Sequence, residues 1–221
     1  MHAKDLISDI VPALKTSDTG IQALNWMEIF RISHLPIVNN TEFLGLISDS
    51  DIFDLNMAEE SIGNHKLSLF SPFVTENQHI YEVIELVAQL KLSVIPVLNN
   101  NKEYIGLITL HDLLQGFAKV TAVDKHGAII ILEMNVNDYF LSEITQIVES
   151  EDSKILSLYV SDSENSSKIE VTLKLNTNDA TRILQSFNRY NYTVKASYME
   201  DNDMTNLYQN RFDEFMRYLN I

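Results

Sequence analysis

The 221-residue chain contains no cysteine. Disulfide bonds, thiolate nucleophiles and cysteine-based zinc sites are therefore excluded, and an intracellular, reducing compartment fits this composition. Glycine and proline are scarce, at 6 and 4 residues, so we expect no long flexible or proline-rich linker. The chain is long enough to form one or two domains with well-buried cores.

Positive charge is also scarce, because 16 lysines and arginines stand against 31 aspartates and glutamates, for a formal net charge of −15. A surface this acidic repels phosphate backbones and anionic lipid headgroups, which disfavours binding to nucleic acid or to a membrane surface. No apolar run approaches the length of a transmembrane helix, and the N-terminus lacks the apolar core of a signal peptide. We therefore expect a cytoplasmic protein.

An internal repeat organises the first half of the chain. Residues 35–51 read LPIVNNTEFLGLISDSD, and residues 95–112 read IPVLNNNKEYIGLITLHD, with one residue inserted in the second Asn-rich turn. An amphipathic segment of helical spacing precedes each copy. Within each copy, proline starts a short apolar strand, the asparagines supply a turn, and a second apolar strand leads into a second helix.

The start of that second helix carries a hydroxyl and, three residues later, an acid: Ser48 and Asp51 in the first copy, Thr109 and Asp112 in the second. As a structural device, this spacing caps a helix N-terminus, and it is sufficient for either copy. As a binding device, the carboxylate would accept hydrogen bonds from a ribose diol, with a phosphate at the helix N-terminus. The duplication does not decide between the two, because a cap is duplicated together with its fold.

The repeated unit, with its apolar-Pro strand and its Gly-Leu-Ile-[Ser/Thr]-x-x-Asp helix start, resembles the CBS domain. Two in tandem resemble a CBS pair over about residues 1–122, with βαββα repeats at about 1–62 and 63–122. The resemblance implies pseudo-symmetric packing and clefts that bind adenosine derivatives such as AMP, ADP, ATP or S-adenosylmethionine. Many members of the family bind no known ligand and serve as dimerisation modules.

Carried onto this sequence, the resemblance implies that Asp51 and Asp112 bind ribose, beside Ser48 and Thr109. The adenine slots would be lined by the residues around the two prolines, namely Ser33, His34, Leu35 and Pro36, and Ser93, Val94, Ile95 and Pro96.

The two clefts differ in charge. Asp49 adds a negative charge where a phosphate would lie in the first copy, whereas His111 offers a donor in the second. We therefore expect the second cleft to be the better site, for a monophosphate or an uncharged adenosyl group rather than a polyphosphate. Arg31 and Lys91 match by position and could reach a phosphate, but we favour their interpretation as charges at helix C-termini.

The pattern changes after residues 124–127. It predicts a strand over 128–134, a helix over 139–149 with Phe140, Leu141, Ile144, Ile147 and Val148 on one face, and strands through 156–160 and 169–175. A helix capped by Asn178 or Asp179 and a strand over 193–198 complete the order βαββαβ, a ferredoxin-like unit.

This second half, residues 126–200, resembles the ACT domain, and the arrangement resembles CBS–ACT regulatory proteins of the acetoin-utilisation type. The resemblance implies amino-acid binding and pairing through sheet edges. The loop 135–139 has no glycine where amino-acid-binding members carry one, so dimerisation is the safer role. Residues 201–221 predict an amphipathic helix, which we expect to pack on the sheet or a sister subunit rather than dock another protein.

Catalysis and metal binding have little support in the sequence. The six histidines are scattered, no phosphate loop or nucleophile motif occurs, and the acids of residues 49–54 lack the glycine and glutamate of a calcium loop. We expect a non-enzymatic regulatory protein with no required cofactor, a bound adenosine-containing ligand, a homodimeric state and an unidentified regulated partner. The alternative is a ligand-free homodimeric scaffold or protein-interaction module.

Overall fold

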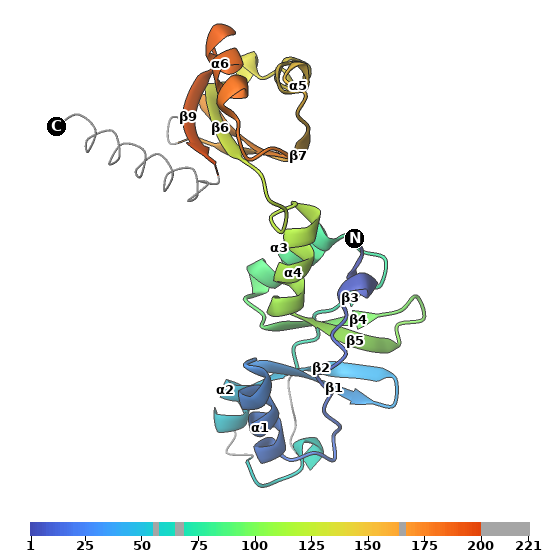
Figure 1. The fold of residues 1–221 in the computed structure, drawn as a ribbon. Coiled ribbons are helices and arrows are strands. Elements are labelled where there is room, and N and C mark those ends of the chain that lie inside the picture. The colour runs from blue at the N-terminus through green and yellow to red at the C-terminus, as the bar shows by residue number, and fades with distance from the viewer. Residues whose placement is uncertain (55–57, 65–68, 164–166, 200–221) are drawn as a thin grey trace, which may run out of the picture. The chain divides into compact units, whose positions relative to one another are not determined.

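The computed structural model describes residues 1–54, 58–64, 69–163 and 167–199 (Figure 1). The chain divides into two compact units, the first comprising residues 1–120 and the second beginning at residue 121. Each unit has its own hydrophobic core. The helix predicted over 201–221 lies outside the described residues.

The first unit contains the two repeats. The first repeat comprises α1 (Gly20–Phe30), β1 (His34–Asn39), β2 (Glu42–Ser48) and α2 (Asp49–Asp54). The second comprises β3 (Val74–Thr75), α3 (Ile80–Leu90), β4 (Val94–Leu98), β5 (Tyr104–Thr109) and α4 (Leu110–Val120). Short 3-10 helices occupy Ala3–Leu6 and Ile62–Asn64. The second repeat has the predicted βαββα order, whereas the leading strand of the first is reduced to a parallel bridge between Leu14 and Ile37.

The strand pairs of the two repeats match closely. β1 pairs antiparallel with β2, and β4 with β5. The register shifts at the same place in both, between Ile37 and Val38 and between Val97 and Leu98. The helices that precede the strand pairs differ in the faces they bury: α3 buries Ile80, Val83 and Val87, whereas α1 buries Ala23 and Met27 and leaves Ile21 and Ile29 exposed.

Each repeat receives the segment that precedes the other. The Ser8 amide donates to the Leu107 carbonyl of β5 (2.8 Å), and the Leu46 amide of β2 donates to the Phe70 carbonyl (2.9 Å). Residues at the very N-terminus, which the sequence assigns to the first repeat, therefore pack on the second. This exchange ties the two repeats into one unit.

The duplicated glycine of the motif lies where the exchanged segments cross. Gly45 and Gly106 have φ angles of +152° and +153°, a region that side chains rarely adopt. A Cβ at Gly45 would lie 2.5 Å from the Leu69 Cβ, and one at Gly106 would lie 2.4 Å from the Ile7 Cγ2. The backbone conformation and the close approach therefore both require glycine at these two positions.

The repeats also meet through hydrogen bonds near the start of β1 and β4. The Ser33 amide donates to the Ser93 Oγ at 2.9 Å, and the His34 Nδ1 lies 3.0 Å from the same oxygen. The Ser93 amide also donates to the His34 Nδ1 (3.4 Å). Because an imidazole nitrogen that accepts from an amide carries no proton, His34 is unprotonated at Nδ1 in this arrangement. Protonation there would break the contact between the repeats.

The second unit is a four-stranded antiparallel sheet with two helices on one face (Figure 1). Its elements are β6 (Ile129–Asn135), a 3-10 helix (Val136–Asp138), α5 (Leu141–Ser150), β7 (Ile155–Asp162), β8 (Lys168–Leu175), α6 (Thr181–Arg189) and β9 (Thr193–Tyr198). The strands lie in the order β7-β8-β6-β9. The βαββαβ order of elements is therefore the one that the sequence predicts.

Burial in the second unit departs from the prediction in two places. Phe140 and Leu141 were expected on the buried face of α5 but are 54% and 49% exposed, because they form the N-cap and first position of the helix. In the strand predicted through 156–160, Leu156 and Leu158 are half-buried and Val160 is exposed. A register shift between Ile155 and Ser157 interrupts the pairing at the start of β7.

Replacing Gly106 with alanine should destabilise the first unit by more than about 1 kcal/mol, because alanine strains at this positive φ and its Cβ meets Ile7. Chemical denaturation of the full chain measures the change. Ile7→Ala removes the side chain nearest to the new Cβ. If Gly106→Ala lowers the free energy of unfolding less in the Ile7→Ala background than in the parent, the difference reports the steric part of the effect. A Gly106→Ala variant as stable as the parent would contradict this account of the motif.

His34→Val places in the first repeat the residue type that the second has at position 94. Burial lowers the pKa of His34 below its usual 6.5, and the negative charges of Asp49 and Asp51 oppose this only partly. The neutral imidazole therefore contributes stability that is present above about pH 6.5 and lost as the pH falls through the folded-state pKa.

We expect the free energy of unfolding to fall less between pH 7.5 and pH 5 in His34→Val than in the parent. Urea denaturation at each pH measures this free energy. His111→Gln removes an exposed imidazole whose side chain contacts Gln115 of the same helix, and it is the control for the loss of a histidine outside the contact between the repeats. Equal pH dependence in His34→Val and the parent would show that His34 does not couple protonation to folding.

Candidate functional site

The start of α2 is held by a reciprocal cap. The Asp51 amide donates to the Ser48 Oγ at 3.1 Å. In return, the Asp51 Oδ2 accepts from the Ser48 amide (2.8 Å) and from the Ser48 hydroxyl (2.7 Å). The capping role expected of this pair is therefore present.

The start of α4 repeats this arrangement. The Asp112 amide donates to the Thr109 Oγ1 at 3.1 Å, and the Asp112 Oδ2 accepts from the Thr109 hydroxyl at 2.6 Å and from its amide at 3.3 Å. Among the described residues, no hydrogen bond reaches the second carboxylate oxygen, Oδ1, of Asp112. The cap therefore engages one of the two carboxylate oxygens of Asp112.

The two caps differ in their surroundings. Asp51 is exposed, whereas Asp112 and Thr109 are partly buried. Asp49 is the first residue of α2, and the position at the start of α4 is held by Leu110. The second cap thus has less negative charge beside it and less contact with water.

The segments expected to form adenine slots lie mostly inside the core. The side chains of Leu35, Pro36, Val94, Ile95 and Pro96 are buried. Their accessible neighbours are Ser33, which is exposed, and His34 and Ser93, which are partly buried. A ligand meeting the molecule as it stands would therefore contact this serine–histidine cluster rather than the apolar side chains.

The strand starts and the helix starts are joined directly. The Asp49 amide donates to the Ser33 carbonyl (3.2 Å), and the Leu110 amide donates to the Ser93 carbonyl (3.3 Å). The structure therefore brings the predicted serine segment and the predicted capping pair of each repeat together. The sequence predicted this proximity only from the spacing of residues within the repeat.

The remaining candidates from the sequence are the cationic residues Arg31 and Lys91 and the histidine His111. Arg31 and Lys91 end α1 and α3 in the left-handed conformation, and their amides donate to carbonyls of the preceding turn. This agrees with their interpretation as helix-end residues. His111 is exposed on α4, where its Nε2 lies 2.8 Å from the Gln115 Nε2.

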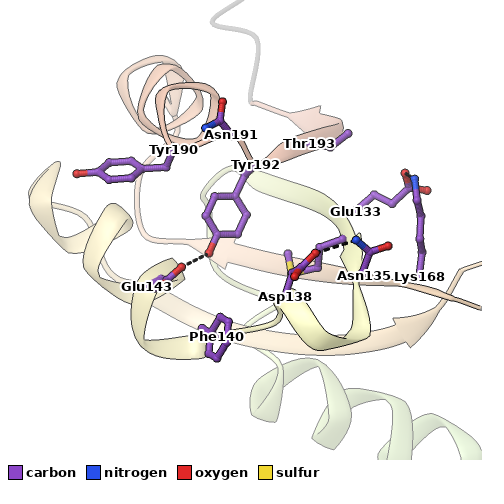
Figure 2. A pocket seen from close by; sticks show the side chains of 11 residues that line it. Glu133, Asn135, Asp138, Phe140, Glu143, Lys168, Tyr190, Asn191, Tyr192 and Thr193 are labelled. Atoms are coloured by element: carbon purple, nitrogen blue, oxygen red, sulfur yellow. Dashed lines mark hydrogen bonds and ion pairs between the residues drawn. The ribbon is translucent and has the colours of Figure 1, made fainter.

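A further cavity, of about 390 Å³, lies in the second unit (Figure 2). Residues of β6, the turn into α5, α5 itself, β8, and the loop before β9 with the first residue of β9 line it, among them Glu133, Asp138, Phe140, Glu143, Lys168 and Tyr192. The sequence analysis named the loop 135–139, for its missing glycine, and Phe140, as part of a helix face. The lining residues come from three separate stretches, 133–143, 168 and 190–193, so no single local motif identifies the cavity.

Metal and membrane sites receive no support from the described parts of the chain. Within those residues, no three histidine or acidic side chains gather in a way that could hold a metal ion. No helix among them is both long enough and apolar enough to cross a membrane.

Comparison with known proteins gives a match in the first unit. The family model of the CBS domain matches residues 3–57 and 70–119. Inosine-5'-monophosphate dehydrogenase of Methanocaldococcus jannaschii is 28% identical over 130 residues, which are 57% of this chain and 25% of that protein. The chain therefore spans about a quarter of the length of this curated relative.

Solved structures with similarity to the chain include a CBS domain pair/ACT domain protein of Thermotoga maritima, with a TM-score of 0.47 and 24% identity over 54% of this chain and 98% of that one. Another is CBSX2 in complex with AMP, with a TM-score of 0.47 and 16% identity over 54% and 97% of the two chains. With the family match, the repeat identifies residues 3–57 and 70–119 as a pair of CBS domains.

Proposed function

We propose that the CBS pair is a non-catalytic sensor module that binds an adenosine-containing ligand of the AMP, ATP or S-adenosylmethionine class. The observation that carries the proposal is the split use of the Asp112 carboxylate. Its Oδ2 is held by Thr109, so the side chain is oriented before any ligand arrives. Its Oδ1 remains available to accept from a ribose hydroxyl, and the α4 N-terminus favours a nearby phosphate.

The second cleft is the preferred site. A phosphate near α2 would meet the charges of Asp49 and Asp51, whereas near α4 it meets Asp112 alone at the helix start. Partial burial of Thr109 and Asp112 strengthens their hydrogen bonds to a ligand, because water competes less there. The scarcity of nearby cations favours a monophosphate or an uncharged adenosyl group.

The second unit is proposed to be an ACT-like dimerisation domain, in a cytoplasmic homodimer that regulates another protein. Its βαββαβ order and its strand order β7-β8-β6-β9 support this assignment, and its two edge strands offer sites for sheet pairing. Ligand binding between the repeats would signal only if the ligand prefers one of two conformations of the chain.

Asp112→Asn tests the ribose contact without removing the cap, because the amide oxygen can still accept from Thr109 while the NH₂ group replaces the open oxygen. The parent should bind AMP about tenfold or more tightly than 2'-deoxy-AMP, since a hydrogen bond to a charged group is worth roughly 1.5–3 kcal/mol. In Asp112→Asn this preference should disappear. Titration calorimetry measures both affinities.

Asp51→Asn makes the same change at the first cap and serves as the matched control, which should keep the preference for AMP. Thermal unfolding of each variant without ligand checks that the caps are intact. If AMP, ATP and S-adenosylmethionine all fail to bind at millimolar concentration, or if Asp112→Asn still discriminates, the sensor proposal is wrong.

A ligand-free homodimeric scaffold is the second candidate, and one observation favours it. An apolar groove of about 370 Å³ lies against α3 and α4, lined by Ile84, Leu110, Leu113, Leu114 and Phe117. Leu114 is 67% exposed in this groove. Such exposure is unusual for a large apolar side chain that belongs to a continuous apolar surface. A second copy of the chain presenting the same face would bury it.

The scaffold predicts that Leu114→Glu shifts the chain from dimer to monomer, because a charge is costly in an apolar interface. Gln115→Glu adds the same charge at the next exposed position of α4 and should leave the dimer in place. Sedimentation over a concentration series, with and without AMP, measures the state. An unchanged dimer in Leu114→Glu would remove this groove from the interface.

A further inference from the structure

The cavity of the second unit has the size of a small-molecule site. Its volume of about 390 Å³ falls within the range of roughly 300–1,000 Å³ in which such ligands bind. A second hollow of about 290 Å³ shares Glu143, Tyr190 and Tyr192 with it. The two together make an elongated groove along α5, which suits an extended ligand better than a compact one.

The charge of the groove is negative. Three carboxylates line it, those of Glu133, Asp138 and Glu143, against one lysine. That lysine, Lys168, donates from its Nζ to the Glu133 Oε1 at 2.7 Å. This hydrogen bond lowers the pKa of Glu133, so the pair is fully charged and mutually neutralised at neutral pH. In the described chain, neither Asp138 nor Glu143 forms an ion pair with a cationic side chain.

Neutral donors orient the two remaining carboxylates. The Asn135 Nδ2 donates to the Asp138 Oδ2 at 2.7 Å, and the Tyr192 hydroxyl donates to the Glu143 Oε2 at 3.1 Å (Figure 2). Burial and the neighbouring Glu143 raise the pKa of Tyr192 to about 12, so this hydroxyl keeps its proton. Each carboxylate therefore has one fixed oxygen and one oxygen left for a ligand.

Three aromatic residues, Phe140, Tyr190 and Tyr192, also line the groove. Phe140 and Tyr190 are 54% and 62% exposed, and Tyr192 is held edge-to-face against Phe187, with ring centroids 5.6 Å apart. Aromatic faces attract ammonium groups and also cover methylene chains. Exposed aromatic surface beside unpaired carboxylates is the combination that recognises an organic cation.

We propose that this groove binds an aliphatic diamine or polyamine. The ammonium groups lie against the open oxygens of Asp138 and Glu143, and the methylene chain lies on Phe140 and Tyr192. A free amino acid is disfavoured, because Lys168 is committed to Glu133 and the ligand carboxylate would face two negative charges. The inference concerns the second unit alone and does not rest on nucleotide binding by the CBS pair.

Cadaverine and lysine make the sharpest pair of probes, because they differ only by the α-carboxylate of lysine. Titration calorimetry of the full chain should show cadaverine binding at least about tenfold more tightly than lysine, with spermidine tighter still. The affinity for cadaverine should fall as sodium chloride rises from 50 to 300 mM, since salt screens exposed charges. Equal binding of the two probes, tighter binding of lysine, or no binding of cadaverine would overturn the proposal.

Variants separate a specific site from general attraction to an acidic protein. Glu143→Gln and Asp138→Asn should each weaken cadaverine binding by roughly tenfold, as expected for hydrogen bonds to charged groups. Phe140→Leu keeps an apolar wall but loses the ring face, and should weaken binding several-fold. Glu149→Gln is the matched control, because Glu149 lies on α5 paired with Lys154 and does not line the cavity. A loss in Glu149→Gln as large as that in Glu143→Gln would contradict the site.

Discussion

The reciprocal hydrogen bonds between a hydroxyl and an aspartate three residues later determine how each repeat of the first unit presents its helix. Thr109 and Asp112 satisfy the first amides of α4 while fixing the direction of the carboxylate. In the function proposed for Asp112, one side chain serves both as structural cap and as binding group, with a different oxygen for each role. This arrangement explains how one motif could be retained for the fold and used by a ligand without conflict.

The sequence predicted the first unit well because its repeat fixes strand, turn and helix together. The Gly-Leu-Ile-[Ser/Thr]-x-x-Asp strings predicted β2 and β5 and the helices that follow them. The exchange of segments was not predictable, since the contact of Ser8 with Leu107 joins residues far apart in sequence. The sequence also did not show that Leu35 and Ile95 are buried, which keeps them from contact with a ligand. An apolar residue beside a cleft and one inside the core cannot be distinguished in sequence.

The second unit was predicted as an order of elements rather than as a site. The strand predicted through 169–175 is β8, whereas β7 carries a register shift and Phe140, expected on the buried face of α5, is exposed at its N-cap. The groove near α5 was not foreseen, because Lys168 of β8 and the rings of Tyr190 and Tyr192 join the acids of residues 133–143 only in the folded unit. Such a site depends on tertiary packing, and its residues share no recognisable spacing in the sequence.

A crystal structure of the full chain with AMP would show whether Asp112 binds the ribose. We expect AMP between the two repeats, with a ribose hydroxyl within hydrogen-bond distance of the Asp112 carboxylate and the Thr109–Asp112 cap still closed. AMP bound elsewhere, or seated in the second cleft with its ribose turned away from Asp112, would contradict this proposal.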